Sequence, residues 1–195
     1  GKNMKNDTVV AIATPMGYGG VGIIRVSGEK SYKIIDKIFY SEKLNSIAEA
    51  ETHTIYYGTI KYKEKLIDKV LIFIMKKGSS YTNEDVVEIS CHGNPFILDE
   101  IVKLIVKSGA RIAEPGEFTK RAYLNNRLDL TQVESVLDVM NAKTENALNS
   151  AVRQLVGGLG NKIKKIEESI KNLLMFVEAD IDFSEDEIEL INNKE

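Results

Sequence analysis

The sequence contains a single cysteine, Cys91, and no apolar stretch that approaches the roughly 20 residues of a membrane-spanning helix. One cysteine excludes an internal disulfide framework and is typical of a protein from a reducing compartment. The first residues are polar and unlike a secretory signal, and we expect Met4, after Gly1 to Asn3, to be the natural start. These observations favour a cytoplasmic protein without a membrane segment.

An excess of positive charge is also missing. The chain has 26 lysines and arginines against 29 aspartates and glutamates, a formal net charge of −3, so it has no overall basic field that would attract nucleic acid. Contact with RNA would need a local basic patch or another domain. The pattern G-x-x-x-x-G-K-[ST], in which backbone amides hold a nucleotide triphosphate, does not occur. We therefore expect no GTP hydrolysis by this chain alone.

From Asp7 to about Ala113 the pattern is that of short strands mixed with two helices. β-Branched apolar runs predict strands, and the polar Lys63–Lys65 between two of them predicts a hairpin. The expected strands are Val9–Ala13, Val21–Val26, Thr54–Tyr62, Leu66–Met75, Val86–Cys91 and Arg111–Ala113. The expected helices are an amphipathic one after Ser27-Gly28, with Ile34, Ile35, Ile38 and Phe39 on one side, and one from Pro95 to Ser108, before Gly109. This half is predicted to be an α+β domain.

After Gly116 the strand pattern stops and helical spacing begins. Thr131 followed by Glu134 predicts a capping box at the start of a helix. A second, long helix is expected from about Asn146 toward Asp180. This part of the chain is therefore predicted to be all-α.

The long helix carries an apolar stripe and several glycines. The stripe consists of Leu155, Leu159, Ile163, Ile166, Ile170, Leu173, Leu174 and Val177. The Gly157-Gly158 pair and Gly160 are expected to weaken the helix by roughly 1 kcal/mol each relative to alanine. The stripe either packs inside an intramolecular bundle or waits for a helix that this chain does not contain. From Glu178 to Glu189 the only charges are acidic, as in a solvated face or frayed end, and we expect a domain boundary near Glu195.

The segment Gly17–Gly22 matches the letters of the dinucleotide-binding pattern G-x-G-x-x-G. In that site the glycines must open a helix, whose amide-rich N-terminus holds the pyrophosphate. Here they run into the extended Val21–Val26, so we reject a dinucleotide site. Two interpretations stay open: a plain turn between strands, or a flexible loop whose bare backbone lets a ligand approach closely.

Cys91 and His92 are adjacent, which could suggest a nucleophile and its base. Neighbouring side chains of a strand point to opposite faces, so the two cannot act on one another. His53 is the only other histidine, which gives little support to a metal cluster. We expect Cys91 to be a buried structural cysteine.

Three charged residues are candidates for a ligand site. Glu88 lies between Val87 and Ile89 inside an expected strand and therefore faces away from both. A carboxylate there either lies on a wet face or accepts two parallel hydrogen bonds from a flat ring with adjacent N–H groups. Arg25 also sits inside a strand, and Arg127 lies in a linker between helices. Each is either a routine surface arginine or part of a site for a ligand with an anionic tail.

Short sequence blocks point to a family. They are Asp7-Thr8 through Ala13-Thr14-Pro15, Gly19–Gly28, Tyr81–Ile89, Cys91-His92-Gly93, Ala113–Asn125, Leu128–Glu134 and Glu178–Phe183. In this order, and over nearly the whole chain, they resemble the MnmE (TrmE) family of bacterial tRNA-modification GTPases, whose GTPase domain follows the last block. The chain departs from the family pattern at Met16 and Tyr18, where relatives often have proline and arginine, and at Asn94, where a second glycine is frequent.

The resemblance implies an architecture and a ligand. Residues 1–118 would form an α+β domain similar to the tetrahydrofolate-binding domains of glycine-cleavage aminomethyltransferases, and residues 119–195 the first part of a helical domain that ends before the GTPase insertion. The family's N-terminal domain dimerises and binds folate near that interface. Matched residue by residue, the folate contacts fall on Arg25, Glu88 and Arg127, with Glu88 on the N–H edge of the pterin and the arginines serving the anionic tail and the electrostatic field of the pocket. Arg127 is lysine in some relatives, which keeps the charge but changes the hydrogen-bond geometry.

The resemblance also implies a function. The family adds an aminomethyl-type group to C5 of the wobble uridine of certain tRNAs, together with the FAD-dependent partner MnmG. The expected cofactor is 5-formyl- or 5,10-methylene-tetrahydrofolate, whereas GTP, magnesium and potassium would bind only in the GTPase domain. For this chain we expect the folate role and a homodimer. Two alternatives stay open: a freestanding folate-dependent aminomethyl transferase, for which no general base stands out, and a dimerisation scaffold with an empty pocket.

Overall fold

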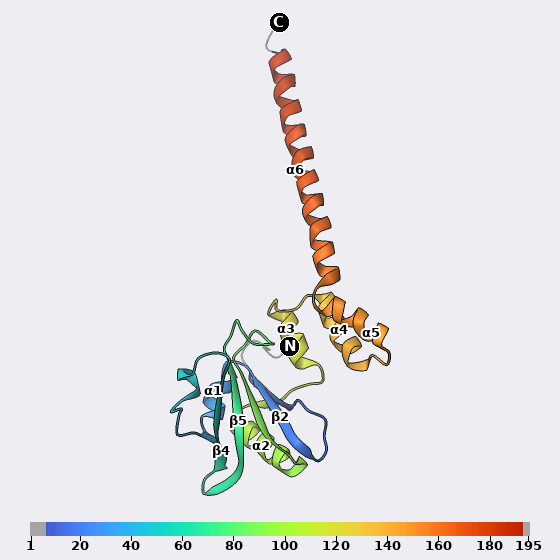
Figure 1. The fold of residues 1–195 in the computed structure, drawn as a ribbon. Coiled ribbons are helices and arrows are strands. Elements are labelled where there is room, and N and C mark those ends of the chain that lie inside the picture. Colours follow the sequence, from blue (N-terminus) through green and yellow to red (C-terminus); the bar gives the residue numbers. More distant parts are fainter. Residues whose placement is uncertain (1–6, 193–195) are drawn as a thin grey trace. The chain divides into compact units, whose positions relative to one another are not determined.

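The computed structural model describes the backbone of residues 7–192, and the chain forms two compact units that divide between Leu128 and Asp129 (Figure 1). The expected start at Met4 lies outside the described residues, as do the side chains of the acidic stretch beyond residue 178. The division falls later than the expected boundary at residue 118. The reason is the helix α3, Glu117–Leu124, which belongs to the first unit because its Glu117 side chain is buried there.

A seven-stranded sheet forms the frame of the first unit, in the order β3-β4-β5-β6-β2-β1-β7. The strands are β1 (Val9–Ile12), β2 (Gly19–Ser27), β3 (Phe39–Tyr40), β4 (Thr54–Tyr62), β5 (Lys65–Met75), β6 (Val86–Gly93) and β7 (Arg111–Ile112). Neighbouring strands pair antiparallel, except that β1 and β7 run parallel. With the helices α1 (Ser31–Ile35) and α2 (Pro95–Lys107) and the short 3-10 helix η1 (Ile47–Glu49), the unit confirms the expected α+β fold.

One face of the sheet carries the hydrophobic core. Its fully buried side chains include Ile24, Val26, Ile72, Ile74, Ile89, Leu98, Ile101 and Ile105. Each isoleucine or leucine buried in this way contributes about 1.5–3 kcal/mol relative to an exposed position. Because side chains alternate along a strand, the residues between them, such as Arg25, Phe73 and Glu88, lie on the opposite face. The candidate site lies on that second face.

Helix α2 begins and ends where the sequence predicts. The side chain of Asn94 accepts a hydrogen bond from the Phe96 amide, and Pro95 occupies the first turn. The helix ends before Gly109, whose φ of 118° lies in the left-handed region that favours glycine. The cap and the terminating glycine therefore fix both ends of the helix that covers the core.

The amphipathic helix expected to reach Phe39 is wrong in its length. Helix α1 ends at Ile35, and Phe39 belongs to β3, where it pairs with Ile60 of β4. The apolar spacing is still used, because Ile35, Ile38 and Phe39 are all buried in the same core. Strand pairing replaces the helix because β4 has room for the ring: a Cβ at Gly58 would lie only 2.4 Å from the Phe39 ring.

The second unit consists of α4 (Leu130–Asn141), α5 (Glu145–Leu155) and α6 (Gly158–Asn192), and its all-α character is as expected. The expected capping box of Thr131 and Glu134 is wrong. Asp129 is the cap: its Oδ1 accepts the Gln132 amide at 2.9 Å, and Oε1 of Gln132 accepts the Asp129 amide at 3.0 Å. Thr131 lies inside the first turn and donates its hydroxyl to Asp129. The extended backbone of Asp129 suits it for this role, which an in-helix threonine cannot take.

The prediction of a single long helix from about Asn146 is also wrong, because the helical conformation is interrupted between α5 and α6. Gly157 has φ 85°, a left-handed conformation that ends a helix and that other residues rarely adopt. The glycine pair therefore separates two helices, rather than only weakening one continuous helix. Side-chain amides join the first two helices, since Gln132 donates to the Leu155 carbonyl and Gln154 to the Thr131 carbonyl.

Helix α6 exposes the expected apolar stripe. The exposed fractions of Ile163, Ile166, Ile170, Leu173, Leu174 and Val177 lie between 49% and 64%. These side chains do not form the core of an intramolecular bundle within the described residues. Across residues 7–192 none of the helices has the combined length and apolar character to cross a membrane.

Candidate functional site

Arg25 and Glu88 meet on the face of the sheet opposite to the core. They are register partners in the antiparallel pairing of β2 and β6. Nε of Arg25 donates to Oε1 of Glu88 at 2.7 Å, and the two side chains are 26% and 20% exposed. Alternation accounts for the position of each residue, and the adjacency of β2 and β6 accounts for their contact.

This ion pair stands in a row of register partners that crosses four strands. Ile55 of β4 pairs with Phe73 of β5, which pairs with Glu88, which pairs with Arg25. A second row beside it consists of Tyr57, Leu71, Ser90 and Ile23. Ile55, Tyr57 and Leu71 are 57%, 61% and 39% exposed. The charged pair therefore borders an accessible apolar and aromatic surface.

Two aromatic rings flank the guanidinium of Arg25. Its Cζ lies 5.4 Å from the centroid of the Tyr81 ring and 5.3 Å from that of Phe118, distances at which a cation and a ring attract each other. Tyr81 comes from the loop before β6, and Phe118 from α3. The Tyr81 hydroxyl is 2.9 Å from Oγ1 of Thr119, so loop and helix are also joined directly. Sequence reasoning missed both rings.

The pair keeps further hydrogen-bonding capacity. Only Oε1 of Glu88 and Nε of Arg25 take part in their bond. The structure gives Oε2 of Glu88 and the Nη atoms of Arg25 no hydrogen bond to a described residue. An acceptor on Glu88 and donors on Arg25, free of bonds to the described residues, thus lie together with flat apolar rings. Such a combination is suited to bind a flat polar ring.

Arg127 does not join this pair. It follows Asn126, which has φ 57°, in the turn after α3, and its amide donates to the Ala122 carbonyl at 2.8 Å. Its side chain is exposed and makes no hydrogen bond or ion pair with the described residues. The turn itself is fixed, because Asn125 exchanges side-chain hydrogen bonds with the Thr82-Asn83 loop. Of the three expected site residues, the structure brings two into contact.

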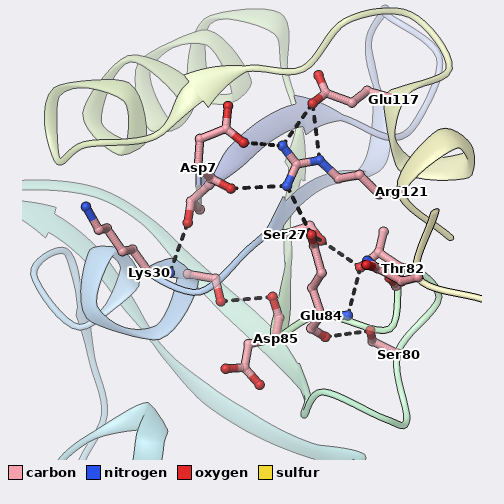
Figure 2. Close-up of polar contacts among 12 residues, drawn as sticks. Asp7, Ser27, Lys30, Ser80, Thr82, Glu84, Asp85, Glu117 and Arg121 are labelled. Atoms are coloured by element: carbon pink, nitrogen blue, oxygen red, sulfur yellow. Dashed lines mark hydrogen bonds and ion pairs between the residues drawn. The ribbon is translucent and has the colours of Figure 1, made fainter. Parts of the chain in front are cut away.

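A network of ion pairs surrounds Arg121, a residue of the same helix as Phe118 (Figure 2). The guanidinium of Arg121, 3% exposed, binds the carboxylates of Asp7, Glu84 and Glu117. Arg111 binds Asp7 and Glu117 as well. The hydrogen bond from Arg111 is the main cause that lowers the pKa of Glu117 to about 2, and Arg121 adds to it. Burial raises the pKa of Asp7, but the hydrogen bonds from the two arginines outweigh burial and leave that pKa lowered.

Cys91 and His92 behave as their alternation predicts. Cys91 is buried, and burial, with the charge of Asp68, raises the pKa of its thiol to about 11. The His92 side chain is 68% exposed, and its Nδ1 lies 2.7 Å from Oδ1 of Asp68, a partner that sequence reasoning missed. No cluster of three or more potential metal ligands occurs in the part of the chain that the structure describes. The structural role expected for Cys91 is confirmed.

The glycine segment forms no dinucleotide site. Gly19 already belongs to β2 and pairs with Gly93 of β6. The two backbones approach so closely that a Cβ on Gly93 would lie 2.7 Å from the Gly19 carbonyl oxygen. The extended strand confirms the rejection of a helix-opening loop.

Comparison with known proteins identifies both units. The family model for the N-terminus of the GTP-binding protein TrmE matches residues 8–127, and the model for the MnmE helical domain matches residues 130–195. The tRNA modification GTPase MnmE of Thermoanaerobacter pseudethanolicus is 48% identical over 191 residues, which are 97% of this chain and 42% of the relative. The MnmE proteins of Alkaliphilus oremlandii and Clostridioides difficile are 46% and 47% identical, over 94% and 95% of this chain and 40% of each relative.

The two matched regions meet where the compact units divide, between Leu128 and Asp129. The chain spans about two fifths of the length of these relatives. The region that it shares with them consists of the N-terminal and helical domains and does not include the GTPase domain. The chain therefore belongs to the MnmE (TrmE) family of tRNA modification GTPases.

Proposed function

We propose that this chain is the portion of a tRNA modification GTPase that binds a reduced folate and forms a homodimer. The observation that carries the proposal is the Arg25–Glu88 pair, at 2.7 Å, beside the rings of Tyr81, Phe118 and Phe73. The ligand is 5-formyl- or 5,10-methylene-tetrahydrofolate. When bound, the methylene form supplies a one-carbon unit, and this chain holds and orients it.

The pair fits the pterin end of such a ligand. A pterin presents adjacent N–H donors on a flat ring, and a carboxylate oxygen accepts such donors with good geometry. Oε2 of Glu88 is the acceptor with remaining capacity, because Oε1 already receives Nε of Arg25. Half-buried aromatic rings beside the carboxylate offer surfaces on which a flat ring packs.

The geometry supports a division of roles between the arginines. Arg25 touches Glu88, so its first role is to orient and neutralise that carboxylate. Arg127 is exposed and has a guanidinium available for the anionic tail of the ligand. This assignment divides between the two arginines the roles expected of them together, the anionic tail and the electrostatic field of the pocket.

The apolar rows on the open face support the homodimer. Ile55, Tyr57 and Leu71 are register partners of the residues around the ion pair and are exposed by 57%, 61% and 39%. Apolar side chains clustered in this way are typical of protein interfaces. Contact with a second copy along these rows would cover them and enclose the ligand.

We place the whole protein's reaction in the cytoplasm and with further components. Together with MnmG it would modify C5 of the wobble uridine of tRNA, while GTP, magnesium and potassium bind in the GTPase domain. Residues 1–128 hold 19 lysines and arginines against 15 acidic residues, and residues 129–195 hold 7 against 14. RNA contacts made by this chain would therefore fall on the first unit, because a polyanion is repelled by the second.

Calorimetric titration of the purified chain with 5-formyltetrahydrofolate tests the proposal. Saturable heat, with one ligand per chain, is expected. A chain that gives no heat at ligand concentrations up to the millimolar range is a scaffold, and the proposal fails. Turnover of a methylene-folate donor by the chain alone would instead indicate a freestanding transferase.

A further inference from the structure

We propose that Arg121 is a positioning residue for the Arg25–Glu88 site. Its buried guanidinium ties together the two segments that place Tyr81 and Phe118 against Arg25. For the identity of the ligand this inference rests on the proposed function. The positioning itself concerns the protein's own geometry and can be measured without ligand.

Arg121 reaches three separate parts of the chain. Within α3, its Nε and Nη2 donate to Glu117 at 3.1 and 2.9 Å. Its Nη1 donates to Glu84, in the loop before β6, at 3.2 Å, and to the carbonyl of Asp7, just before β1, at 3.1 Å. An arginine whose donors serve three segments at once fixes their relative positions, since its planar fork permits little rotation.

The first arm leads to Tyr81. Glu84, which Arg121 holds, also accepts the hydroxyl of Ser27 at 2.7 Å, and its backbone carbonyl accepts the hydroxyl of Ser80 at 2.6 Å (Figure 2). Ser27 follows Arg25 by two positions on β2 and therefore lies on the same face of the sheet. These hydrogen bonds thus fix the loop that carries Tyr81 to the strand that carries Arg25.

The second arm leads to Phe118. Glu117, its neighbour in α3, is 2% exposed and accepts hydrogen bonds from Arg121, from Arg111 at 2.6 Å and from the Glu114 amide at 2.7 Å. These bonds fix the first turn of α3. The Phe118 ring is consequently held 5.3 Å from Cζ of Arg25.

Arg111 provides a matched comparison. Like Arg121, it binds Asp7 and Glu117, but the structure gives it no bond to Glu84. Both arginines stabilise the network, whereas only Arg121 reaches the loop of Tyr81. Replacing either arginine by lysine keeps the positive charge and removes the planar guanidinium with its several hydrogen-bond donors. If Arg121 acts by positioning, the two replacements will differ at Arg25, even if they cost similar stability.

The experiment measures Arg121→Lys and Arg111→Lys in the full chain by three readouts. These are thermal unfolding, the side-chain Nε–H resonance of Arg25 without ligand, identified by its absence in Arg25→Lys, and the affinity for 5-formyltetrahydrofolate. Arg121→Lys should shift or broaden the Arg25 resonance and weaken folate binding about tenfold, the lower end of the loss seen when the partners that orient a metal ligand are removed. Arg111→Lys leaves the bonds of Arg121 to Glu84 and Glu117 in place and should have a clearly smaller effect on both readouts.

An unchanged Arg25 resonance in Arg121→Lys would overturn the inference, as would equal effects of both variants in proportion to their loss of stability. If Arg121→Lys does not fold, Glu84→Gln is measured in the same way with the same criteria. This variant weakens only the contacts that hold the loop of Tyr81. If the unchanged chain binds no folate, the proposed function fails, but the Arg25 resonance still decides whether Arg121 positions the site.

Discussion

Arg25 stands directly across the β2–β6 pairing from Glu88, and the two side chains join at 2.7 Å on the face of the sheet that is turned away from the core. The contact leaves one carboxylate oxygen and the two terminal nitrogens of the guanidinium without a hydrogen bond to the described residues. The rings of Tyr81 and Phe118 both lie within cation–ring contact of the guanidinium of Arg25, at 5.4 and 5.3 Å from its Cζ. A charged pair that is held in place and still has hydrogen-bonding capacity is suited to bind a ligand.

Glu88→Ala should weaken the binding of 5-formyltetrahydrofolate by about 2–5 kcal/mol, the usual cost of removing one side of a hydrogen-bonded charged contact. The variant also leaves Arg25 without its partner. Ser90→Ala is the matched control, because Ser90 lies two positions along β6 on the same face. Calorimetry that finds equal affinities for Glu88→Ala and Ser90→Ala would remove Glu88 from the site.

The ring of Tyr81 should matter more than its hydroxyl. Tyr81→Phe keeps the ring beside Arg25 and loses only the bond to Thr119, which predicts a loss of about 0.5–1.5 kcal/mol in the free energy of unfolding. Folate affinity should stay within about twofold. Tyr81→Ala removes the cation–ring contact, worth about 0.5–1 kcal/mol, and should weaken binding measurably. The opposite order of the two affinities would contradict a role for the ring.

Stability at acid pH should depend on Glu117. Its pKa is lowered from 4.5 to about 2, chiefly by the hydrogen bond from Arg111. A carboxylate with a lowered pKa in the folded state stabilises the protein above its unfolded pKa, and the contribution is lost as pH falls through the folded pKa. Urea unfolding should therefore show a decline between about pH 4.5 and 2 that is smaller in Glu117→Gln. Parallel declines in the two proteins would show that another group is responsible.

Cys91 should be unreactive in the folded protein. Burial, aided by the charge of Asp68, raises the pKa of its thiol to about 11, so little thiolate is present at pH 8. A disulfide reagent such as DTNB should react slowly with the native chain and rapidly in guanidinium chloride. Rapid reaction under native conditions would mean that the strand around Cys91 opens easily.

Much of the first unit could be predicted from the sequence because alternation is a local property. β-Branched runs and the hairpin turn predicted the strands, and alternation predicted that Glu88 faces away from Val87 and Ile89. The contact between Arg25 and Glu88 could not be predicted, since it depends on β2 and β6 being neighbours in the sheet. The contribution of Tyr81 and Phe118 depends on the same tertiary arrangement.

The errors in the helical parts have local physical causes. Asp129 caps α4 in place of Thr131, because its carboxylate precedes the helix on an extended backbone. Gly157 breaks the long helix because it adopts a left-handed conformation, which glycine permits at little cost. Phe39 leaves the expected helix because Gly58 opens space for it beside β4. In each case a single residue decided between two structures compatible with the apolar pattern.

The most direct test of the folate assignment is a crystal structure of this chain with 5-formyltetrahydrofolate. We expect the pterin ring on the face of the sheet beside Arg25, with the Glu88 carboxylate about 2.7–3.2 Å from ring or amino nitrogens. A ligand bound elsewhere, with no contact to Glu88, would contradict the account.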